Sequence, residues 1–332
     1  MSTTTIAPSD ATPLVIRGLS LSVKADEGRR ALLDGVDITV GKGEIVGLVG
    51  ESGSGKSVTS RAALGLFPGT AEVDGVVTVD GVEILGAPQS ALKEVRRRRA
   101  SMIFQDPRSS VNAVRRVGDF LTEGLRARGV SKAEAQSRAL ELLDEVGIRE
   151  PEKAMRQFPH EFSGGMLQRI VIAGALSTRP RLLLADEATT ALDVTTQAEV
   201  VGLLKRLQQE TGTGLLFVTH NLELAAALCD RVYVMYAGRV VETGSTSELF
   251  ESPQHPYTVG LLNSNPPLTG ERQTLTPITG RPLALADAPS GCAFRDRCPI
   301  AVAECAQQVP ELLPHGGTES ACIRPGEAEV AR

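Results

Sequence analysis

The sequence contains no tryptophan, and aromatic residues make up only 3% of its 332 residues. Proteins that bind single-stranded nucleic acid usually stack the bases on aromatic side chains, so this composition argues against such a role. Basic residues are not in excess either, because 35 lysines and arginines face 40 aspartates and glutamates, for a formal net charge of −5. That balance lacks the electrostatic footprint of a nucleic-acid-binding protein. We therefore expect no nucleic acid among its partners.

Long hydrophobic runs are also missing. No apolar stretch approaches the ~20 residues that a transmembrane helix needs. The first residues, Met1 to Ile6, lack the basic segment and apolar stretch of a signal peptide. We expect the chain to fold in the cytosol and to reach a membrane only through partner proteins. Hydrophobic residues make up 42% of the sequence, enough to build a substantial core.

The most informative segment runs from Gly50 to Ser57 and reads Gly-Glu-Ser-Gly-Ser-Gly-Lys-Ser. It matches the pattern G-x-x-x-x-G-K-S of a phosphate-binding loop, and it lies between a strand-like apolar run and a helix-compatible run. Backbone N–H groups of such a loop cradle phosphates at a helix N-terminus. Lys56 would reach the β- and γ-phosphates of a nucleotide, and Ser57 would hold Mg²⁺. The residues expected to contact the nucleotide here are Gly50, Glu51, Ser52, Gly53, Ser54, Gly55, Lys56, Ser57 and Val58.

A second apolar run, starting at Leu182, ends in two carboxylates, Asp186 and Glu187. Asp186 is placed to hold Mg²⁺, directly or through water, and Glu187 to polarise a water for attack on the γ-phosphate. An ordinary strand end with solvated acids has the same pattern in isolation. The phosphate-binding loop upstream favours the catalytic interpretation.

Four further short elements accompany these two. Gln105 lies in Met-Ile-Phe-Gln-Asp-Pro, and Ser163-Gly-Gly opens a helix-like run whose glycines would let a phosphate approach the backbone closely. Asp193 follows the acid pair in Ala-Leu-Asp, and His220 ends a strand-like run. A single histidine after a strand is usually structural, but all of these elements in this order are not accidental.

In this order the motifs resemble the ATP-binding subunit of an ABC transporter, over roughly residues 14–262. The resemblance implies that ATP and Mg²⁺ are bound, that Glu187 is the catalytic base or orients the attacking water, and that His220 contacts the γ-phosphate. It implies that Gln105 helps to hold Mg²⁺, together with Ser57 and Asp186, and couples the site to the membrane subunits.

The resemblance also implies a site shared between two ATPase subunits. Ser163, Gly164 and Gly165 would contact the γ-phosphate of a nucleotide held by the partner subunit, and Asp193 would lie at the dimer interface. ATP binding is then expected in the single chain, whereas hydrolysis needs a second subunit, as a heterodimer or a homodimer.

The residues in and around three of these motifs resemble one branch of the family. The segments 158–166, 188–194 and 255–258 look like those of importers for dipeptides, oligopeptides and nickel. This implies an ATPase that powers peptide import on the cytoplasmic face of the inner membrane, with two transmembrane permease subunits and an extracytoplasmic substrate-binding protein. A nickel or metal-chelate importer of the same branch is the alternative. A soluble ABC ATPase acting on nucleic acid or ribosomes is disfavoured by the single phosphate-binding loop and the acidic charge.

The C-terminal cysteines, Cys292, Cys298, Cys305 and Cys322, are spaced C-x5-C-x6-C-x16-C. Disulfides are rare in the cytosol, and structural zinc sites usually show closer cysteine pairs. Four thiolates can also hold a [4Fe–4S] cluster, or the cysteines can simply pack as small apolar residues. The stretch resembles the C-terminal extension of peptide-importer ATPases, which favours the cluster, with Zn²⁺ as the alternative.

These patterns predict an α/β fold, because strand-like runs alternate with helical ones, as in a mostly parallel sheet covered by helices. We expect a disordered N-terminus (1–12), an ABC-type P-loop ATPase domain (13–262), a proline-rich linker (263–290) and a small cysteine-containing C-terminal extension (291–332). Within the ATPase domain we expect an antiparallel β subdomain and a helical subdomain at about 108–180.

Overall fold

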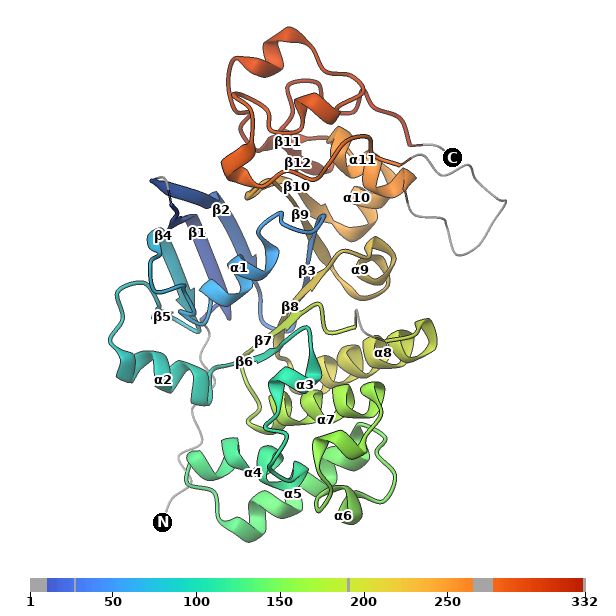
Figure 1. Cartoon of the computed structure of the whole chain (residues 1–332). Coiled ribbons are helices and arrows are strands. Elements are labelled where there is room, and N and C mark those ends of the chain that lie inside the picture. The colour runs from blue at the N-terminus through green and yellow to red at the C-terminus, as the bar shows by residue number, and fades with distance from the viewer. Residues whose placement is uncertain (1–10, 27, 190–191, 265–276, 331–332) are drawn as a thin grey trace.

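The computed structural model describes residues 11–26, 28–189, 192–264 and 277–330 (Figure 1). Most of the predicted N-terminal segment, and residues 265–276 of the predicted linker, fall outside these ranges. Two sheets form the framework, a four-stranded sheet in the order β2-β1-β4-β5 and an eight-stranded sheet in the order β11-β12-β10-β9-β3-β8-β7-β6. No helix in these ranges is both long and apolar enough to cross a bilayer.

The smaller sheet is antiparallel throughout and is the predicted β subdomain. Its strands are β1 (Leu14–Lys24), β2 (Arg29–Val40), β4 (Glu72–Val79) and β5 (Val82–Glu83).

The larger sheet has a parallel centre made of β3, β6, β7, β8 and β9. Its strands are β3 (Ile45–Val49), β6 (Ala100–Ile103), β7 (Leu182–Asp186), β8 (Gly214–Thr219), β9 (Arg231–Tyr236), β10 (Arg239–Ser245), β11 (Leu313–His315) and β12 (Thr318–Ser320). Because parallel strands point the same way, the segments after β3, β6, β7 and β8 leave the sheet at one edge. All of these segments carry predicted site residues.

Both faces of the large sheet are buried. In β8, Leu215 and Phe217 belong to the core shared with the helices, whereas Leu216 and Val218 belong to the core shared with the antiparallel sheet. Side chains of a strand alternate between its two faces, so one continuous apolar run supplies both cores.

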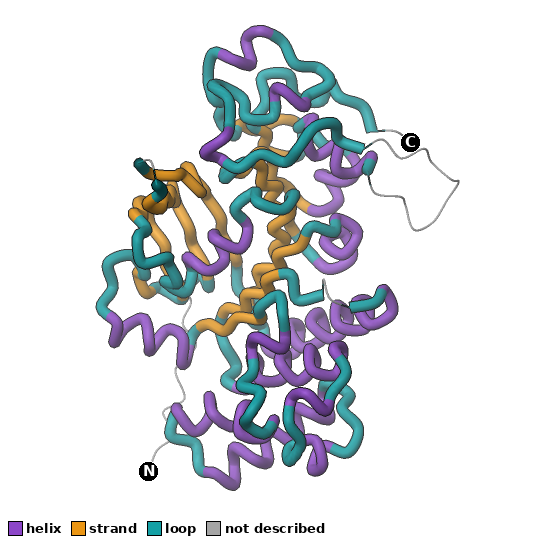
Figure 2. The backbone as a smooth tube through the Cα atoms, in the orientation of Figure 1, coloured by secondary structure: helices purple, strands orange, loops and turns teal. Residues whose placement is uncertain are grey.

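The predicted helical subdomain is present, and Figures 1 and 2 show it as a group of helices beyond the β6–β7 edge of the sheet. Ser131 caps the start of α5 by accepting a hydrogen bond from the backbone N–H of Glu134 at 3.2 Å. In α8, Val201, Leu204 and Leu207 are buried, whereas Ala198 is exposed. The helices are α1 (Lys56–Ala62), α2 (Gln89–Arg98), α3 (Pro107–Ser110), α4 (Val117–Ala127), α5 (Lys132–Glu145), α6 (Pro151–Ala154), α7 (Gly164–Ser177), α8 (Val194–Thr211), α9 (Leu222–Leu228), α10 (Thr246–Glu251) and α11 (Pro256–Asn263).

The region after residue 290 packs on the ATPase core and does not stand apart from it. Strand β12 pairs with β10 and so extends the large sheet beyond β10. Phe294 is 2% exposed, and its ring centroid lies 5.3 Å from those of Tyr236 and Tyr257. The pairing of β12 with β10 covers a sheet edge whose backbone N–H and C=O groups would otherwise be unpaired. Figure 1 shows this region against β9 and β10.

Candidate ATP site

The phosphate-binding loop connects β3 to α1, as its pattern predicts. Gly50 has φ 150°, and a Cβ there would lie 2.2 Å from the carbonyl oxygen of Met235. Gly55 has φ 105°, and a Cβ there would lie 2.7 Å from Leu33 Cδ2. Both positions therefore need glycine, for conformation and for space.

Lys56 lies folded over this loop and is 4% exposed. Its Nζ donates to the carbonyl oxygens of Gly50, at 2.8 Å, and Glu51, at 2.9 Å. Burial lowers the pKa of Lys56, and the nearby carboxylates of Glu187, Asp186 and Glu51 oppose that shift. The ammonium group is thus held at the loop, where a phosphate would meet it.

Ser57 and Asp186 form the candidate magnesium site. Ser57 Oγ donates to Asp186 Oδ1 at 2.7 Å. The other oxygen, Asp186 Oδ2, is buried without a hydrogen-bond donor among the described residues and lies 3.7 Å from Arg61 Nη2. Burial raises the pKa of Asp186, and the Ser57 hydrogen bond opposes the rise. A buried carboxylate oxygen of this kind beside a hydroxyl suits a hard, oxygen-binding cation such as Mg²⁺.

The three residues predicted to be catalytic meet at the carboxyl edge of the large sheet. Gln105 follows β6 and donates through Nε2 to Glu187 Oε2 at 2.7 Å. His220 follows β8, and its Nδ1 lies 3.5 Å from Glu187 Oε1. Glu187 has φ 50°, and its backbone N–H donates to Val218 O at 3.0 Å. The strained backbone turns the Glu187 carboxylate between the two neighbouring side chains.

The Ser-Gly-Gly segment and Asp193 form a second group, at the N-termini of α7 and α8. Ser163 caps α7 by accepting from the N–H of Met166 at 3.3 Å. Asp193 caps α8 through Thr196, accepting from its N–H at 3.1 Å and its Oγ1 at 2.7 Å. A Cβ at Gly165 would lie 2.8 Å from Thr196 Cγ2, so the two helix starts are closely packed. The phosphate-binding loop lies instead at the start of α1 (Figure 1).

Comparison with known proteins agrees with this geometry. Residues 33–190 match the model of the ABC transporter family, and residues 241–305 match the C-terminal region of oligopeptide/dipeptide transporters. The oligopeptide transport ATP-binding protein OppD of Escherichia coli is 44% identical over 317 residues, which cover 95% of this chain and 94% of that protein. The chain belongs to the ABC transporter family, in its oligopeptide/dipeptide branch.

Further relatives extend the comparison. OppD of Bacillus subtilis is 46% identical over 305 residues, covering 90% of this chain and 85% of that protein. Among solved structures, the ATP-binding cassette MJ0796, described as dimeric in a post-hydrolysis state with ADP and Pi, superposes with a TM-score of 0.63 at 27% identity. That match covers 70% of this chain and 98% of the other. The match establishes the cassette fold, and the family establishes an ATPase.

Tyr257 and Arg297 of this ABC ATPase contact Glu51 of the phosphate-binding loop and were not predicted from the sequence. Tyr257 OH accepts a hydrogen bond from the Glu51 backbone N–H at 2.8 Å. Arg297 donates from Nη1 to Glu51 Oε2 at 2.6 Å and from Nη2 to Oε1 at 3.0 Å. Tyr257 lies in a His-Pro-Tyr-Thr segment that marked the branch, whereas Arg297 lies in the cysteine-containing stretch and carried no signal of its own.

The four C-terminal cysteines of the ABC ATPase line one cavity of ≈ 20 Å³ and are free thiols. Burial raises the pKa of the Cys292 and Cys298 thiols, and that of Cys322 to about 11, and repulsion from the neighbouring cysteines adds to each rise. The backbone N–H of Arg324 donates to Cys322 Sγ at 3.3 Å. Within the described ranges, no three His, Cys, Asp or Glu side chains are already arranged as the ligands of a metal ion.

Proposed function

We propose that this chain is the ATP-hydrolysing subunit of an importer for dipeptides and oligopeptides, bound peripherally to the cytoplasmic face of the inner membrane. The observation that carries the proposal is the position of Glu187, between Gln105 and His220 and next to the Ser57–Asp186 pair. The cargo class rests on the relatives, because the OppD proteins are named for oligopeptide transport.

The phosphate-binding loop would bind ATP. Backbone N–H groups of residues 50–58 would surround the β- and γ-phosphates, except that of Glu51, which donates to Tyr257 OH. Lys56 would leave its two loop carbonyls to reach the phosphates. Ser57, Asp186 and Gln105 are the side chains that would hold Mg²⁺, which neutralises phosphate charge when it is bound. Asp186 fits this role because its Oδ2 is buried and receives no hydrogen bond from the residues that the structure describes.

Glu187 would orient the attacking water and accept its proton. Its carboxylate already has two polar neighbours, the amide of Gln105 and the imidazole of His220, which fix its direction. His220 is half exposed, with 54% of its side-chain surface accessible, and could turn toward the γ-phosphate. The side chains that orient Glu187 therefore all come from this chain, at one edge of its large sheet.

A second ATPase subunit would complete the site. Ser163, Gly164 and Gly165 at the start of α7 would bind the γ-phosphate of the nucleotide on that subunit, with backbone N–H groups pointing to the anion. Asp193 would lie at the interface between the two. The second subunit would be another copy of this chain or a related ATPase. Two transmembrane permease subunits and an extracytoplasmic substrate-binding protein complete the proposed importer, with no nucleic acid involved.

We further propose that the chain divides into the ATPase domain at 13–262, a linker at 263–290 and the cysteine-containing extension at 291–332.

We propose that the extension holds a [4Fe–4S] cluster on Cys292, Cys298, Cys305 and Cys322. The shared cavity and the N–H donated to Cys322 Sγ support this assignment, because thiolates need partners that offset their charge.

The metal content of the anaerobically purified chain tests this site. Iron and acid-labile sulfide in a roughly 1:1 ratio, lost together in C298S, would support the cluster. A colourless protein with one zinc per chain would show that the cysteines bind Zn²⁺ instead of the cluster. A protein with neither metal would show that the cysteines only pack.

Cargo is tested by uptake in cells that carry the wild-type chain or its Glu187→Gln variant at equal protein levels. We expect uptake of labelled dipeptides and oligopeptides to be lost with the variant and nickel uptake to be unchanged. Loss of nickel uptake alone would select the metal importer of the same branch. Undiminished uptake of both would overturn the proposed transport role.

A further inference from the structure

We propose that Arg297 is a positioning residue for the phosphate-binding loop, so that the affinity of the ATPase for nucleotide depends on the C-terminal region. The inference rests on the ATP site proposed above and not on the cargo. It assigns a role to a residue that lies 246 positions from its partner in the sequence.

The contact between Arg297 and Glu51 is bidentate and partly buried, which restricts the movement of both side chains. Both oxygens of the Glu51 carboxylate accept from the guanidinium, at 2.6 and 3.0 Å, in a bidentate arrangement. The Arg297 side chain is only 5% exposed. Its Nε donates to Thr279 O at 2.8 Å, and its guanidinium carbon lies 5.7 Å from the ring centroid of Tyr236. Because Thr279 O and the Tyr236 ring also hold the guanidinium, it keeps the Glu51 carboxylate in one position.

Glu51 in turn connects Arg297 to the backbone of the loop and to Lys56. It is the second residue of the loop, and its carbonyl oxygen is one of the two acceptors that hold Lys56 Nζ. Its backbone N–H is occupied by Tyr257 OH, from α11. The Glu51 peptide is therefore fixed through its side chain by Arg297 and through its N–H by Tyr257. Loss of the Arg297 contact would free the Glu51 peptide and so loosen the loop backbone that is proposed to surround the phosphates.

The position of Arg297 in the chain also connects the phosphate-binding loop to the cysteine cavity. Arg297 ends the short 3-10 helix Arg295–Arg297, and Cys298 is the next residue. A conformational change at that cysteine therefore moves the backbone that carries the guanidinium. Because coupling between two sites is reciprocal, nucleotide on the loop would also stabilise the region around Arg297.

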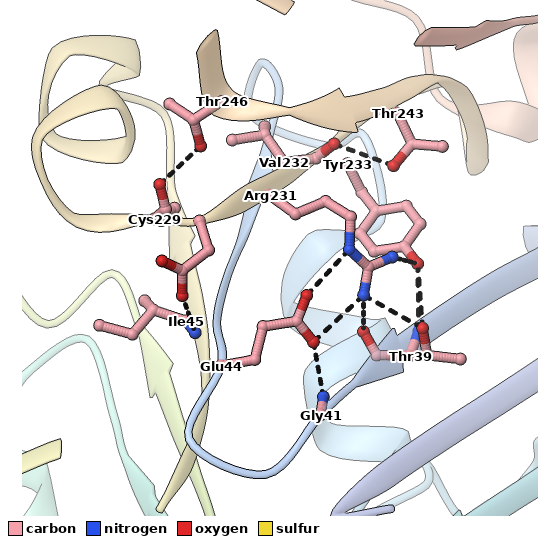
Figure 3. Close-up of polar contacts among 11 residues, drawn as sticks. Thr39, Gly41, Glu44, Ile45, Cys229, Arg231, Val232, Tyr233, Thr243 and Thr246 are labelled. Carbon is pink, nitrogen blue, oxygen red and sulfur yellow. Dashed lines mark hydrogen bonds and ion pairs between the residues drawn. The ribbon is translucent and has the colours of Figure 1, made fainter. Parts of the chain in front are cut away.

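The chain offers a matched control in a second arginine–glutamate pair (Figure 3). Arg231 donates to Glu44 Oε1 at 2.9 Å and to Oε2 at 3.3 Å. Like Arg297, it contacts a tyrosine, since its Nη1 donates to Tyr233 OH at 2.5 Å. This pair ties β9 to the turn before β3, and within the described ranges the polar contacts of the Arg231 side chain are with Glu44, Thr39 and Tyr233. Its loss should cost stability without changing the loop.

The experiment measures equilibrium binding of a fluorescent ATP analogue, with Mg²⁺, to the full chain and its variants. For R297M we expect a Kd about tenfold higher than for the wild type, within the 5- to 150-fold range typical of coupled sites. R297K, which keeps the charge but not the bidentate fork, should fall between the two and serves if R297M does not fold. R231M should lower the thermal midpoint but leave Kd within about twofold of wild type.

A double-mutant cycle shows whether Arg297 acts through Glu51. E51Q replaces one acceptor oxygen by a donor, and E51Q/R297M should bind nucleotide no more weakly than the weaker single variant. Additive losses, wild-type affinity in R297M, or an equal loss in R231M would each overturn the inference. If the wild-type chain and R231M both failed to bind nucleotide, the proposed ATP site itself would be wrong.

Discussion

Gln105 and Glu187 are joined by a hydrogen bond of 2.7 Å across the ends of two neighbouring parallel strands, β6 and β7. The amide donates to one carboxylate oxygen, and His220 lies 3.5 Å from the other. The carboxylate is therefore oriented from both sides before any water is placed. Gln105 also connects the catalytic edge to the helical subdomain, because α3 begins two residues later.

Replacing Gln105 by alanine should slow ATP turnover more than it weakens nucleotide binding. The carboxylate of Glu187 would lose the donor that fixes its direction, whereas the phosphate-binding loop would be untouched. We expect kcat to fall by about tenfold, a part of the 10²–10⁴ that a positioned general base contributes. Steady-state ATPase assays and nucleotide titrations measure the two quantities separately. A raised Kd with an unchanged kcat would show that Gln105 serves binding and not orientation.

Replacing Asp186 by asparagine should remove the effect of Mg²⁺ on nucleotide affinity. The side-chain oxygen of asparagine can still accept from Ser57 Oγ, so the local hydrogen bond survives, but the negative charge for the cation is gone. We expect the wild-type chain to bind ATP more tightly with Mg²⁺ than with a chelator, and the variant to bind equally in both. A variant that keeps the full Mg²⁺ effect would exclude Asp186 as a ligand.

Stability should fall as the pH decreases below neutrality, partly because of His255. This histidine is 1% exposed, and burial lowers its pKa from 6.5 to about 3. The unfolded chain therefore takes up a proton that the folded chain refuses, so stability is present above pH 6.5 and is lost as the pH falls toward 3. Between pH 7 and 5 the expected loss is about 2 kcal/mol.

The variant His255→Asn isolates this contribution, because asparagine can still accept from the backbone N–H of Tyr257 as the N-cap of α11. Denaturant unfolding of both proteins at pH 7 and pH 5 gives the measurement. The stability difference between wild type and variant should shrink by that amount at the lower pH. A difference independent of pH would mean that the histidine is not the titrating group.

The phosphate-binding loop, the acid pair and the residues after β6 and β8 could be predicted from the sequence because their chemistry is local. Each follows one buried parallel strand, and parallel strands bring their carboxyl ends to one edge. The Ser163 and Asp193 caps are local too, because each accepts from the backbone N–H three residues further on.

The contacts from the C-terminal region could not be predicted in the same way. Arg297 and Tyr257 reach Glu51 from 246 and 206 positions away, and neither stands in a pattern that names its partner. Strands β11 and β12 have three residues each, too few for an alternating pattern. The spacing of the cysteines likewise does not reveal that they line one cavity, because that depends on how the loops between them fold.

The most direct test of the account is ATP turnover by Glu187→Gln. The substitution keeps the shape of the side chain and removes the charge that would accept a proton from water. The account predicts nucleotide affinity equal to that of the wild type and turnover, measured with the partner subunits present, reduced by about 10²–10⁴. Hydrolysis at the wild-type rate in this variant would contradict it.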